Sequence, residues 1–392
     1  MTFKNRYAAF LSAVVVAAAM FALPVAAQEQ VKGLNVAFLK GTPHELGLQQ
    51  GTIYKQQIND VYKIYLNEMV YKKWVKEYAI LKGKSNAYAN PKAAVIKFAK
   101  SIEQYIPEEY REEMKGLAEG AGLKYEEVLA MSAHVDYFAM LMCSTFVATG
   151  SESADGKLVE ARNLDWASGG ATELDPMSTL FVYKPDKGHS FISMIYPGIV
   201  GALTAVNDAG LTVELNFSMA TKNGTEGMPA LIIVRYIAQN AGSLDEAEKL
   251  LRGIKRMAGY NIMITDNKTN DARLIEISSD TVGTLGVSPE GTLITTNHFT
   301  TKELAGKNAN TSSFSQAPSP DRYDRLAALL KENHGKVDPK LAMTMIHDPA
   351  VKVSGTVQTV VFKLSEGKIW VWTRGRQPGD FIEFDVNELL KK

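Results

Sequence analysis

A change of periodicity at Cys143 constrains the fold more than any other feature of this chain. Before it, apolar residues such as Ile58, Val61 and Tyr65 recur at helical spacing. After it, apolar and polar residues alternate with period two, interrupted by turn-forming dipeptides such as Asp155-Gly156. Helices followed by hairpin-connected strands predict an α+β protein, with two antiparallel sheets faced by helices.

The segment before Cys143 is expected to be mostly helical. A short strand is predicted over Leu34 to Leu39, followed by a helix with Thr42 as its cap and Pro43 in its first turn. Further helices are expected to begin at Asn90-Pro91, near Pro107 and at Tyr125, the last one running through Phe138.

The segment after Cys143 carries the strands. Clear examples are Leu158 to Asn163, Phe191 to Tyr196, Leu211 to Asn216 and Thr356 to Leu364. Helices are expected at Pro229 to Ala241, Ser243 to Gly253, Asp321 to Glu332 and Pro339 to Ile346. The stretch Lys307 to Pro320, rich in Asn, Ser, Thr and Pro, is expected to be a long loop near the active site.

The first 27 residues have the pattern of a signal peptide. Lys4 and Arg6 precede an apolar run, and Pro24-Val25-Ala26-Ala27 ends in small residues, which predicts cleavage after Ala27 and export to the periplasm or the medium. The alternative is an uncleaved membrane anchor. Removal of the segment leaves a formal net charge of about −2, which offers no general attraction to nucleic acid or to an anionic membrane.

Cys143 is the only cysteine, so it cannot form an internal disulfide in an exported chain. A catalytic role is therefore a better explanation for this cysteine than a disulfide. No phosphate-binding glycine loop is present, and His44-Glu45 lacks the second histidine of a zinc helix. We expect neither a cofactor nor a metal.

A nucleophilic cysteine needs a base, and two candidates exist. A papain-type pair with His298 is one, although the residues around Cys143 lack the signature of that family. The other is the α-amino group of Cys143 itself, which has a pKa of about 8 once it is free. This second hypothesis requires a cut between Met142 and Cys143, which we expect at an exposed junction where a helix ends and a strand begins at Cys143.

Arg162 and Asp165 are the predicted partners of the thiol. In a hairpin that turns at Asp155-Gly156, their strand runs back beside Cys143. A guanidinium nearby favours the thiolate, and a carboxylate can hold the α-amino group by hydrogen bonds. The alternative is an exposed cross-strand ion pair worth about 0.2–1 kcal/mol.

These residues resemble a known family. Cys143-Ser144-Thr145-Phe146, Asp155-Gly156-Lys157 and Arg162-Asn163-Leu164-Asp165-Trp166 are similar to motifs of the amino-terminal-nucleophile hydrolases, in the group of bile salt hydrolase, penicillin V acylase and isopenicillin acyltransferase. The resemblance continues through strands ending near Asn216 and Asn297, which imply oxyanion-hole groups, and through Arg322, which implies a late active-site arginine. It extends from Cys143 essentially to the end of the chain.

The front half resembles the acyltransferase-type and phospholipase-B-like branch of that group, on the opening Gly41-Thr42-Pro43-His44-Glu45-Leu46-Gly47. The resemblance implies that residues 28–142 form a helical pro-segment that stays bound as an α chain. It also implies that residues 143–392 form the catalytic β chain, within a four-layer αββα sandwich.

The implied activity is hydrolysis of a linear amide with a hydrophobic acyl group, through a thioester on Cys143. Alternatives are transfer of the acyl group to an amine, a phospholipase-B-like lipid hydrolase, and a non-catalytic periplasmic binding protein on the same scaffold. Trp166, Tyr196 and Trp370 are candidates for an acyl pocket but by default are core residues, and Arg325 is a rival to Arg322. The sequence leaves a homo-oligomer open.

Overall fold

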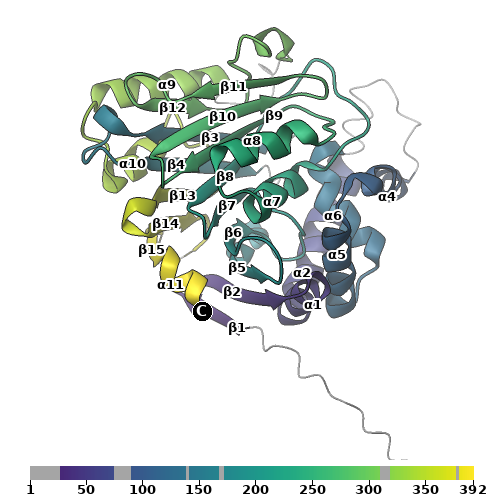
Figure 1. Cartoon of the computed structure of the whole chain (residues 1–392). Coiled ribbons are helices and arrows are strands. Elements are labelled where there is room, and N and C mark those ends of the chain that lie inside the picture. Colours follow the sequence, from purple (N-terminus) through teal and green to yellow (C-terminus); the bar gives the residue numbers. More distant parts are fainter. Residues whose placement is uncertain (1–26, 75–89, 138–140, 167–171, 310–317, 377–378) are drawn as a thin grey trace, which may run out of the picture.

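The structure is a computed structural model that describes residues 27–74, 90–137, 141–166, 172–309, 318–376 and 379–392. Two stacked sheets form its centre, with helices on both outer faces (Figure 1). This is the predicted α+β sandwich of four layers. The predicted signal segment 1–26 and loop residues 310–317 lie outside the described residues.

The larger sheet has nine strands. In spatial order they are β1 (Ala27–Val31), β2 (Leu34–Gly41), β5 (Thr179–Pro185), β6 (Phe191–Ile195), β7 (Thr204–Asn207), β8 (Leu211–Phe217), β9 (Tyr260–Asp266), β10 (Asp271–Ile277) and β11 (Val282–Gly286). The smaller sheet has the order β12 (Thr292–Thr295), β3 (Leu141–Ala148), β4 (Val159–Trp166), β13 (Thr356–Lys363), β14 (Lys368–Thr373) and β15 (Ile382–Asp385).

Neighbouring strands are antiparallel, as predicted, with the exception of β2 and β5, which run parallel. β2 precedes the front helices and β5 follows the β3–β4 hairpin, so the chain returns to the sheet by a long crossover instead of a tight turn. The front segment therefore contributes two strands to the nine-stranded sheet in addition to its helices.

Helices cover the outer face of each sheet. On the larger sheet lie the front helices α1 (Pro43–Ile53), α2 (Lys55–Val61), α4 (Pro91–Ile102), α5 (Glu108–Ala121) and α6 (Tyr125–Tyr137), with the π-helix η1 (Tyr62–Trp74), and also α7 (Ala230–Asn240) and α8 (Leu244–Gly253). On the smaller sheet lie α9 (Ser319–Glu332) and α10 (Pro339–Ile346), while the C-terminal helix α11 (Val386–Lys391) follows β15.

Short 3-10 turns complete the described elements. They are η2 (Glu103–Tyr105), η3 (Gly150–Glu152), η4 (Thr172–Met177), η5 (Ala305–Lys307) and η6 (Leu364–Glu366).

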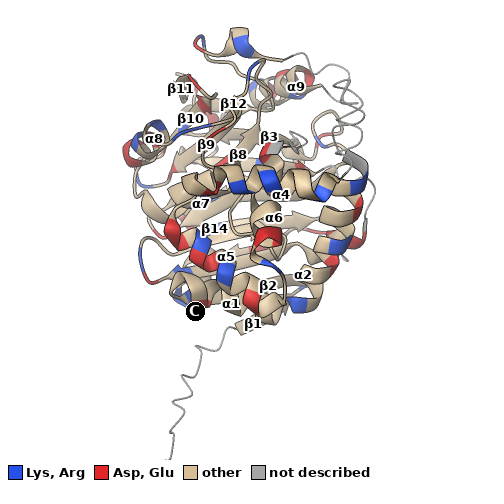
Figure 2. Ribbon diagram, turned by 90° about the vertical axis from the view of Figure 1, so that its right-hand side faces the viewer, with Lys and Arg blue, Asp and Glu red and all other residues tan. Residues whose placement is uncertain are grey.

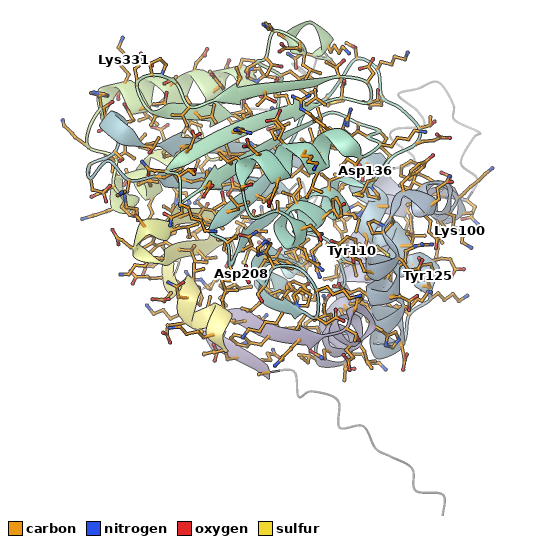
Figure 3. All side chains as sticks on the ribbon, in the orientation of Figure 1. Lys100, Tyr110, Tyr125, Asp136, Asp208 and Lys331 are labelled. Carbon is orange, nitrogen blue, oxygen red and sulfur yellow. The ribbon has the colours of Figure 1, made fainter. Side chains whose placement is uncertain are left out.

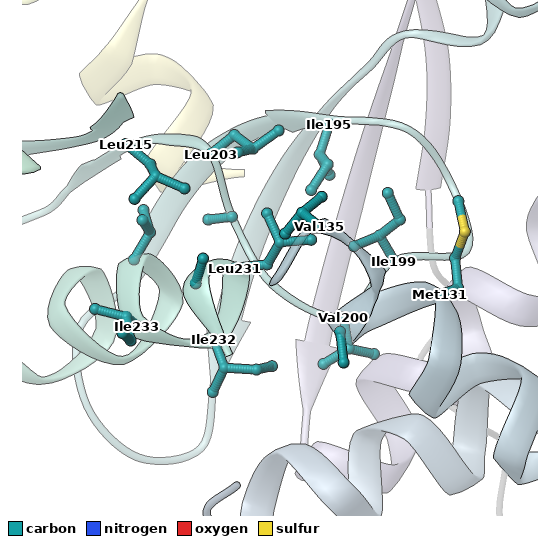
Figure 4. Close-up of a cluster of buried hydrophobic side chains, with 14 of the residues drawn as sticks. Met131, Val135, Ile195, Ile199, Val200, Leu203, Leu215, Leu231, Ile232 and Ile233 are labelled. Carbon is teal, nitrogen blue, oxygen red and sulfur yellow. The ribbon is translucent and has the colours of Figure 1, made fainter. Parts of the chain in front are cut away.

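The front helices form a single core with the nine-stranded sheet. Met131 and Val135 of α6 pack against Ile199 and Val200 and against Leu231 of α7, all fully or almost fully buried (Figure 4). Acidic and basic residues are interspersed along the front helices (Figure 2). The front segment is therefore packed as part of the domain.

Helices α1 and α5 approach closely because glycines line their contact. A Cβ on Gly47 would lie 1.9 Å from the Glu113 carbonyl oxygen, and one on Gly116 would lie 2.0 Å from that of His44. The start of α1 agrees with the prediction: Thr42 is the N-cap, Pro43 lies in the first turn, and Thr42 and Glu45 form a complete capping box.

One local prediction is wrong. The strand does not begin at Cys143: β3 begins at Leu141 and pairs with β4 through Leu141↔Trp166 and Met142↔Asp165. Cys143 is fully buried, so the Met142–Cys143 bond does not lie at an exposed junction in the uncut chain. No helix in the described parts combines the length and apolar character needed to cross a membrane.

Candidate active site

The β3–β4 hairpin places Arg162 against the only thiol of the chain. Thr145 pairs with Arg162 and Cys143 with Leu164, so these side chains share the face turned toward the larger sheet. Arg162 Nη2 lies 3.4 Å from Cys143 Sγ. The predicted contact between guanidinium and sulfur is therefore present.

Arg162 is itself held by the larger sheet. Its Nη2 donates to the Leu215 carbonyl oxygen at 2.5 Å, and its Nη1 donates to Thr204 Oγ1. Its Nε lies 3.8 Å from a carboxylate oxygen of Glu214. Because the side chain is almost fully buried, these contacts fix the guanidinium between the two sheets.

Asp165 approaches Cys143 from the other face of β4, because side chains alternate along a strand. Its Oδ1 accepts a hydrogen bond from Thr356 Oγ1 at 2.6 Å, and its Oδ2 lies 3.9 Å from Arg322 Nη1. Burial raises the pKa of Asp165 to about 6, against the opposing effect of the Arg322 charge. The alternative of an exposed ion pair is excluded by its burial.

Arg322 and Asn297 surround the backbone of Cys143. Arg322, on α9, donates to the Cys143 carbonyl oxygen at 2.6 Å and to Ser144 Oγ at 2.7 Å. Asn297 Oδ1 accepts from the Cys143 N–H at 2.8 Å and from Arg322 Nη2 at 2.8 Å. The nitrogen that a cut after Met142 would release therefore already has a hydrogen-bond acceptor.

The amide nitrogens of both predicted oxyanion residues are engaged elsewhere in the uncut chain. Asn216 Nδ2 donates to the Thr295 carbonyl oxygen at 3.2 Å, and Asn297 Nδ2 donates to that of Phe217 at 2.7 Å. The structure brings both asparagines to the same end of the site, but their role as oxyanion donors stays a prediction.

The thiol is neutral in this state. Burial raises the pKa of Cys143 to about 11, only partly offset by the positive charge of Arg162. Its Sγ donates toward the Leu215 carbonyl oxygen at 3.5 Å. The structure therefore shows a buried, protonated thiol with the Arg162 guanidinium beside it.

His298 contacts Ser319 in this structure. Its Nδ1 lies 2.7 Å from Ser319 Oγ, whose oxygen also accepts the Asn297 backbone N–H at 2.7 Å. Within the described part of the chain, no contact joins His298 to Cys143. The papain-type pair is therefore absent from this structure.

The other predicted residues separate into two groups. The rings of Trp166 and Tyr196 meet edge to face, with centroids 5.4 Å apart. Tyr65 contacts Trp166 in the same way. Trp370 lies on β14 and donates to Glu383, and Arg325 binds Asp348 at 2.7 Å, so neither faces Cys143.

The family of the chain follows from its sequence as a whole. Residues 152–377 match the model of the family described as acyl-coenzyme A:6-aminopenicillanic acid acyl-transferase. The chain belongs to this family. It is thus a member of the amino-terminal-nucleophile hydrolase superfamily. The matched residues include Arg162, Asp165, Asn216, Asn297 and Arg322 and begin nine residues after Cys143.

Curated relatives are distant. An uncharacterized protein of Archaeoglobus fulgidus is 23% identical over 86% of this chain and 63% of its own length, and protein dcd1A of Dictyostelium discoideum is 23% identical over 89% and 80%. Acid ceramidase of Heterocephalus glaber is 24% identical over 55% of this chain and 62% of its own length.

Among solved structures, the N-acylethanolamine-hydrolyzing acid amidase ortholog of Caenorhabditis elegans matches with a TM-score of 0.44 and 18% identity, covering 56% of this chain and 92% of that one. Penicillin V acylase from Agrobacterium tumefaciens matches with a TM-score of 0.42 and 12% identity, covering 63% and 87%.

Several residues at the site were not predicted. Thr204, Glu214 and Thr356 contact Arg162 or Asp165, and Ser319 holds the backbone of Asn297. The only sequence signal for Glu214 was its alternation with Thr212 and Asn216 on an otherwise apolar strand.

Proposed function

We propose that this chain is an exported hydrolase that cuts itself between Met142 and Cys143 and then cleaves a linear amide bearing a hydrophobic acyl group. The observation that carries the proposal is the position of Cys143. Its thiol lies against Arg162 at 3.4 Å, and its backbone nitrogen is already hydrogen-bonded to Asn297 at 2.8 Å.

The self-cleavage step uses the thiol of Cys143 and the carbonyl group of the residue before it. The Cys143 thiol attacks the Met142 carbonyl carbon, the C–N bond breaks, and the proton passes to the released nitrogen, which leaves a thioester that water hydrolyses. The new α-amino group, with a pKa of about 8, can then act as the base. Asn297 Oδ1 is in place to orient it, and Asp165 supplies a nearby negative charge.

The amide reaction follows the same chemistry. The thiolate attacks the substrate carbonyl, the α-ammonium group protonates the leaving amine as the C–N bond breaks, and water releases the acid from the thioester. Asn216 and Asn297 would have to exchange their present carbonyl acceptors for the oxyanion. Losing one such donor typically costs about 2.7–4 kcal/mol of transition-state stabilisation.

A retained α chain is supported by the packing of the front segment. β2 lies beside β5 in the sheet, and Glu113 of α5 forms a buried ion pair with Arg235 of α7. We therefore propose that residues 28–142 stay bound to residues 143–392 after the cut.

Mass spectrometry of purified protein tests the processing. Fragments beginning near Gln28 and at Cys143 are expected. Both cleavage and activity should vanish in Cys143→Ala, while Cys143→Ser should cleave only slowly. An intact single chain with full activity would show that the self-cleavage proposal is wrong.

Acyl transfer is the second candidate, favoured by the description of the family model. Product analysis with and without an added amine acceptor separates it from hydrolysis. The acid ceramidase relatives favour a lipid amide as substrate. A screen should therefore contrast ceramide with penicillin V, conjugated bile salts, acyl-homoserine lactones and N-acyl amino acids, and should include a phospholipid for the lipid-hydrolase alternative.

A non-catalytic binding protein would give a different result. Such a protein would bind an acyl ligand while Cys143 resisted a thiol-alkylating reagent in the processed chain. Rapid labelling of Cys143 together with release of an acid product would exclude it.

A further inference from the structure

A buried carboxyl pair lies between the two sheets, next to the arginine that contacts the thiol. Glu160 comes from β4 of the smaller sheet and Glu214 from β8 of the larger one, and both are fully buried. Thr212 donates to Glu160 at 2.6 Å and lies two residues from Glu214 on the same face of β8, so the two carboxyl groups are neighbours across the sheets. Nothing in the processing or amide chemistry described above uses this pair.

Two carboxylates cannot hydrogen-bond to each other unless one of them carries a proton. One oxygen of each group, Oε1 in both cases, is buried and has no other hydrogen-bond partner among the described residues. Burial raises the pKa of Glu160 to about 7, and burial together with repulsion from Glu160 raises that of Glu214 well above its ordinary value. A single proton held by the pair removes this repulsion.

The remaining oxygens are bound by hydroxyl groups. Glu160 Oε2 accepts from Thr212 at 2.6 Å and from Thr265 at 3.1 Å. Glu214 Oε2 accepts from Thr145 at 3.2 Å and faces Arg162 Nε at 3.8 Å. The surroundings are otherwise apolar, since the inter-sheet clusters around Leu180 and Met263 flank this layer. Threonine hydroxyl groups therefore hold both carboxyl groups, and one of the two faces the Arg162 guanidinium.

The carboxyl pair contributes to the balance of charge around the Cys143 thiol. Arg162 on β4 is the direct neighbour, Cys143 on β3 contacts that arginine, and Asp165 and Arg322 lie beyond them on the other face of the smaller sheet. With one shared proton the pair carries one negative charge, which balances Arg162 as Asp165 balances Arg322. The thiol then sits in a locally neutral site.

We propose that Glu160 and Glu214 share one proton and are positioning residues that act through Arg162. The single negative charge that they retain balances the charge of Arg162, so that the guanidinium does not stabilise the thiolate too strongly, while Thr204 and the Leu215 carbonyl hold the guanidinium in place. This inference rests on the proposed role of Cys143 as a nucleophile.

Glutamine substitutions test the number of protons, because an amide copies a protonated carboxyl group in size and as a donor. Glu160→Gln and Glu214→Gln each preserve one negative charge, so we expect each to keep the wild-type pH midpoint of Cys143 alkylation. The double variant removes the charge and leaves Arg162 unbalanced. Its alkylation midpoint should move to lower pH by about one unit or more.

The measurement is the rate of iodoacetamide labelling against pH in the processed protein, where Cys143 is the only thiol. Glu113→Gln is the matched control, because it also removes a buried carboxylate that faces an arginine, but far from the thiol. That control should lose stability without moving the midpoint. An unshifted midpoint in the double variant would overturn the proposal.

Infrared spectroscopy gives an independent readout that needs no substrate and no labelling. The difference spectrum between wild type and Glu160→Gln at pH 8 should contain a protonated-carboxyl band belonging to wild type alone. Its absence would overturn the shared proton. If the protein hydrolysed no amide, the proposed function would be wrong, but the infrared band and the labelling midpoint would still test the shared proton. If the double variant did not fold, the infrared band alone would test it.

Discussion

Two buried arginines in this molecule show how different surroundings give the same side chain different roles. Arg235 is bound bidentately by Glu113, donates through its Nε to Gln239, and lies over the rings of Tyr183 and Phe191 at 4.3 and 4.4 Å. Arg162 faces its carboxylate only at 3.8 Å and directs one nitrogen to a thiol. Arg235 joins α5 to α7 through these contacts, whereas Arg162 Nε has no hydrogen-bond partner among the described residues and its Nη2 faces the thiol that we propose as the nucleophile.

The buried ion pair of Glu113 and Arg235 should contribute most to stability. Glu113→Ala leaves the Arg235 charge buried without its partner, so we expect the free energy of unfolding to fall by about 3–5 kcal/mol. Urea denaturation measures this. Glu108→Ala, which breaks an exposed ion pair with Arg111, should cost no more than about 1 kcal/mol. Equal losses in the two variants would contradict the role assigned to Arg235.

The incompletely satisfied arginine should matter most for activity. Arg162→Met removes the donor that faces Cys143 Sγ, and we expect a loss of about 10²–10³-fold in kcat/KM, the size seen when one active-site donor is removed. Arg235→Met should instead retain turnover per folded molecule. If Arg235→Met abolished turnover in folded protein while Arg162→Met did not, the roles assigned to the two arginines would be wrong.

The contact between α1 and α5 next to Arg235 offers a smaller test. Gly116→Ala places a methyl group 2.0 Å from a backbone oxygen of α1, so the helices must separate. We expect a cost of about 1–3 kcal/mol in thermal or urea unfolding. Gly253→Ala at the end of α8 meets nothing within 4 Å and serves as the control, with little or no loss expected.

A further test concerns pH and the end of α6. Burial raises the pKa of Asp136 to about 7, although Tyr260 and the Ala230 N–H donate to it. Asp136 on α6 and Tyr110 on α5, both in the front segment, are labelled in Figure 3. Because the folded state binds this proton more tightly than the unfolded chain, stability from Asp136 is present below about pH 4 and is lost as pH rises to about 7.

Asp136→Asn should therefore flatten the fall in stability between pH 4 and 7, by at most about 1.4 kcal/mol per pH unit. The measurement is the midpoint of thermal unfolding across that range, compared with wild type. An unchanged slope would mean that Asp136 is ionised throughout.

The sequence predicted the parts of the site that follow from local pattern. The turn at Asp155-Gly156 was sufficient to bring Arg162 and Asp165 beside Cys143, since a hairpin fixes the pairing of its own strands. Glu214 and Thr204 could not be assigned, because nothing in the sequence tells which strand of one sheet faces which strand of the other. The start of β3 was misplaced because pairing with Trp166 and Asp165 extends the strand back to Leu141, beyond what local periodicity shows.

The parallel contact between β2 and β5 has a practical consequence for making this protein in pieces. If residues 143–392 were produced alone, the backbone N–H and C=O groups of β5 that now pair with β2 would form an open sheet edge. Such edges readily recruit other strands and promote aggregation. Recombinant production of residues 143–392 should therefore start from the full chain, or supply the front segment during refolding.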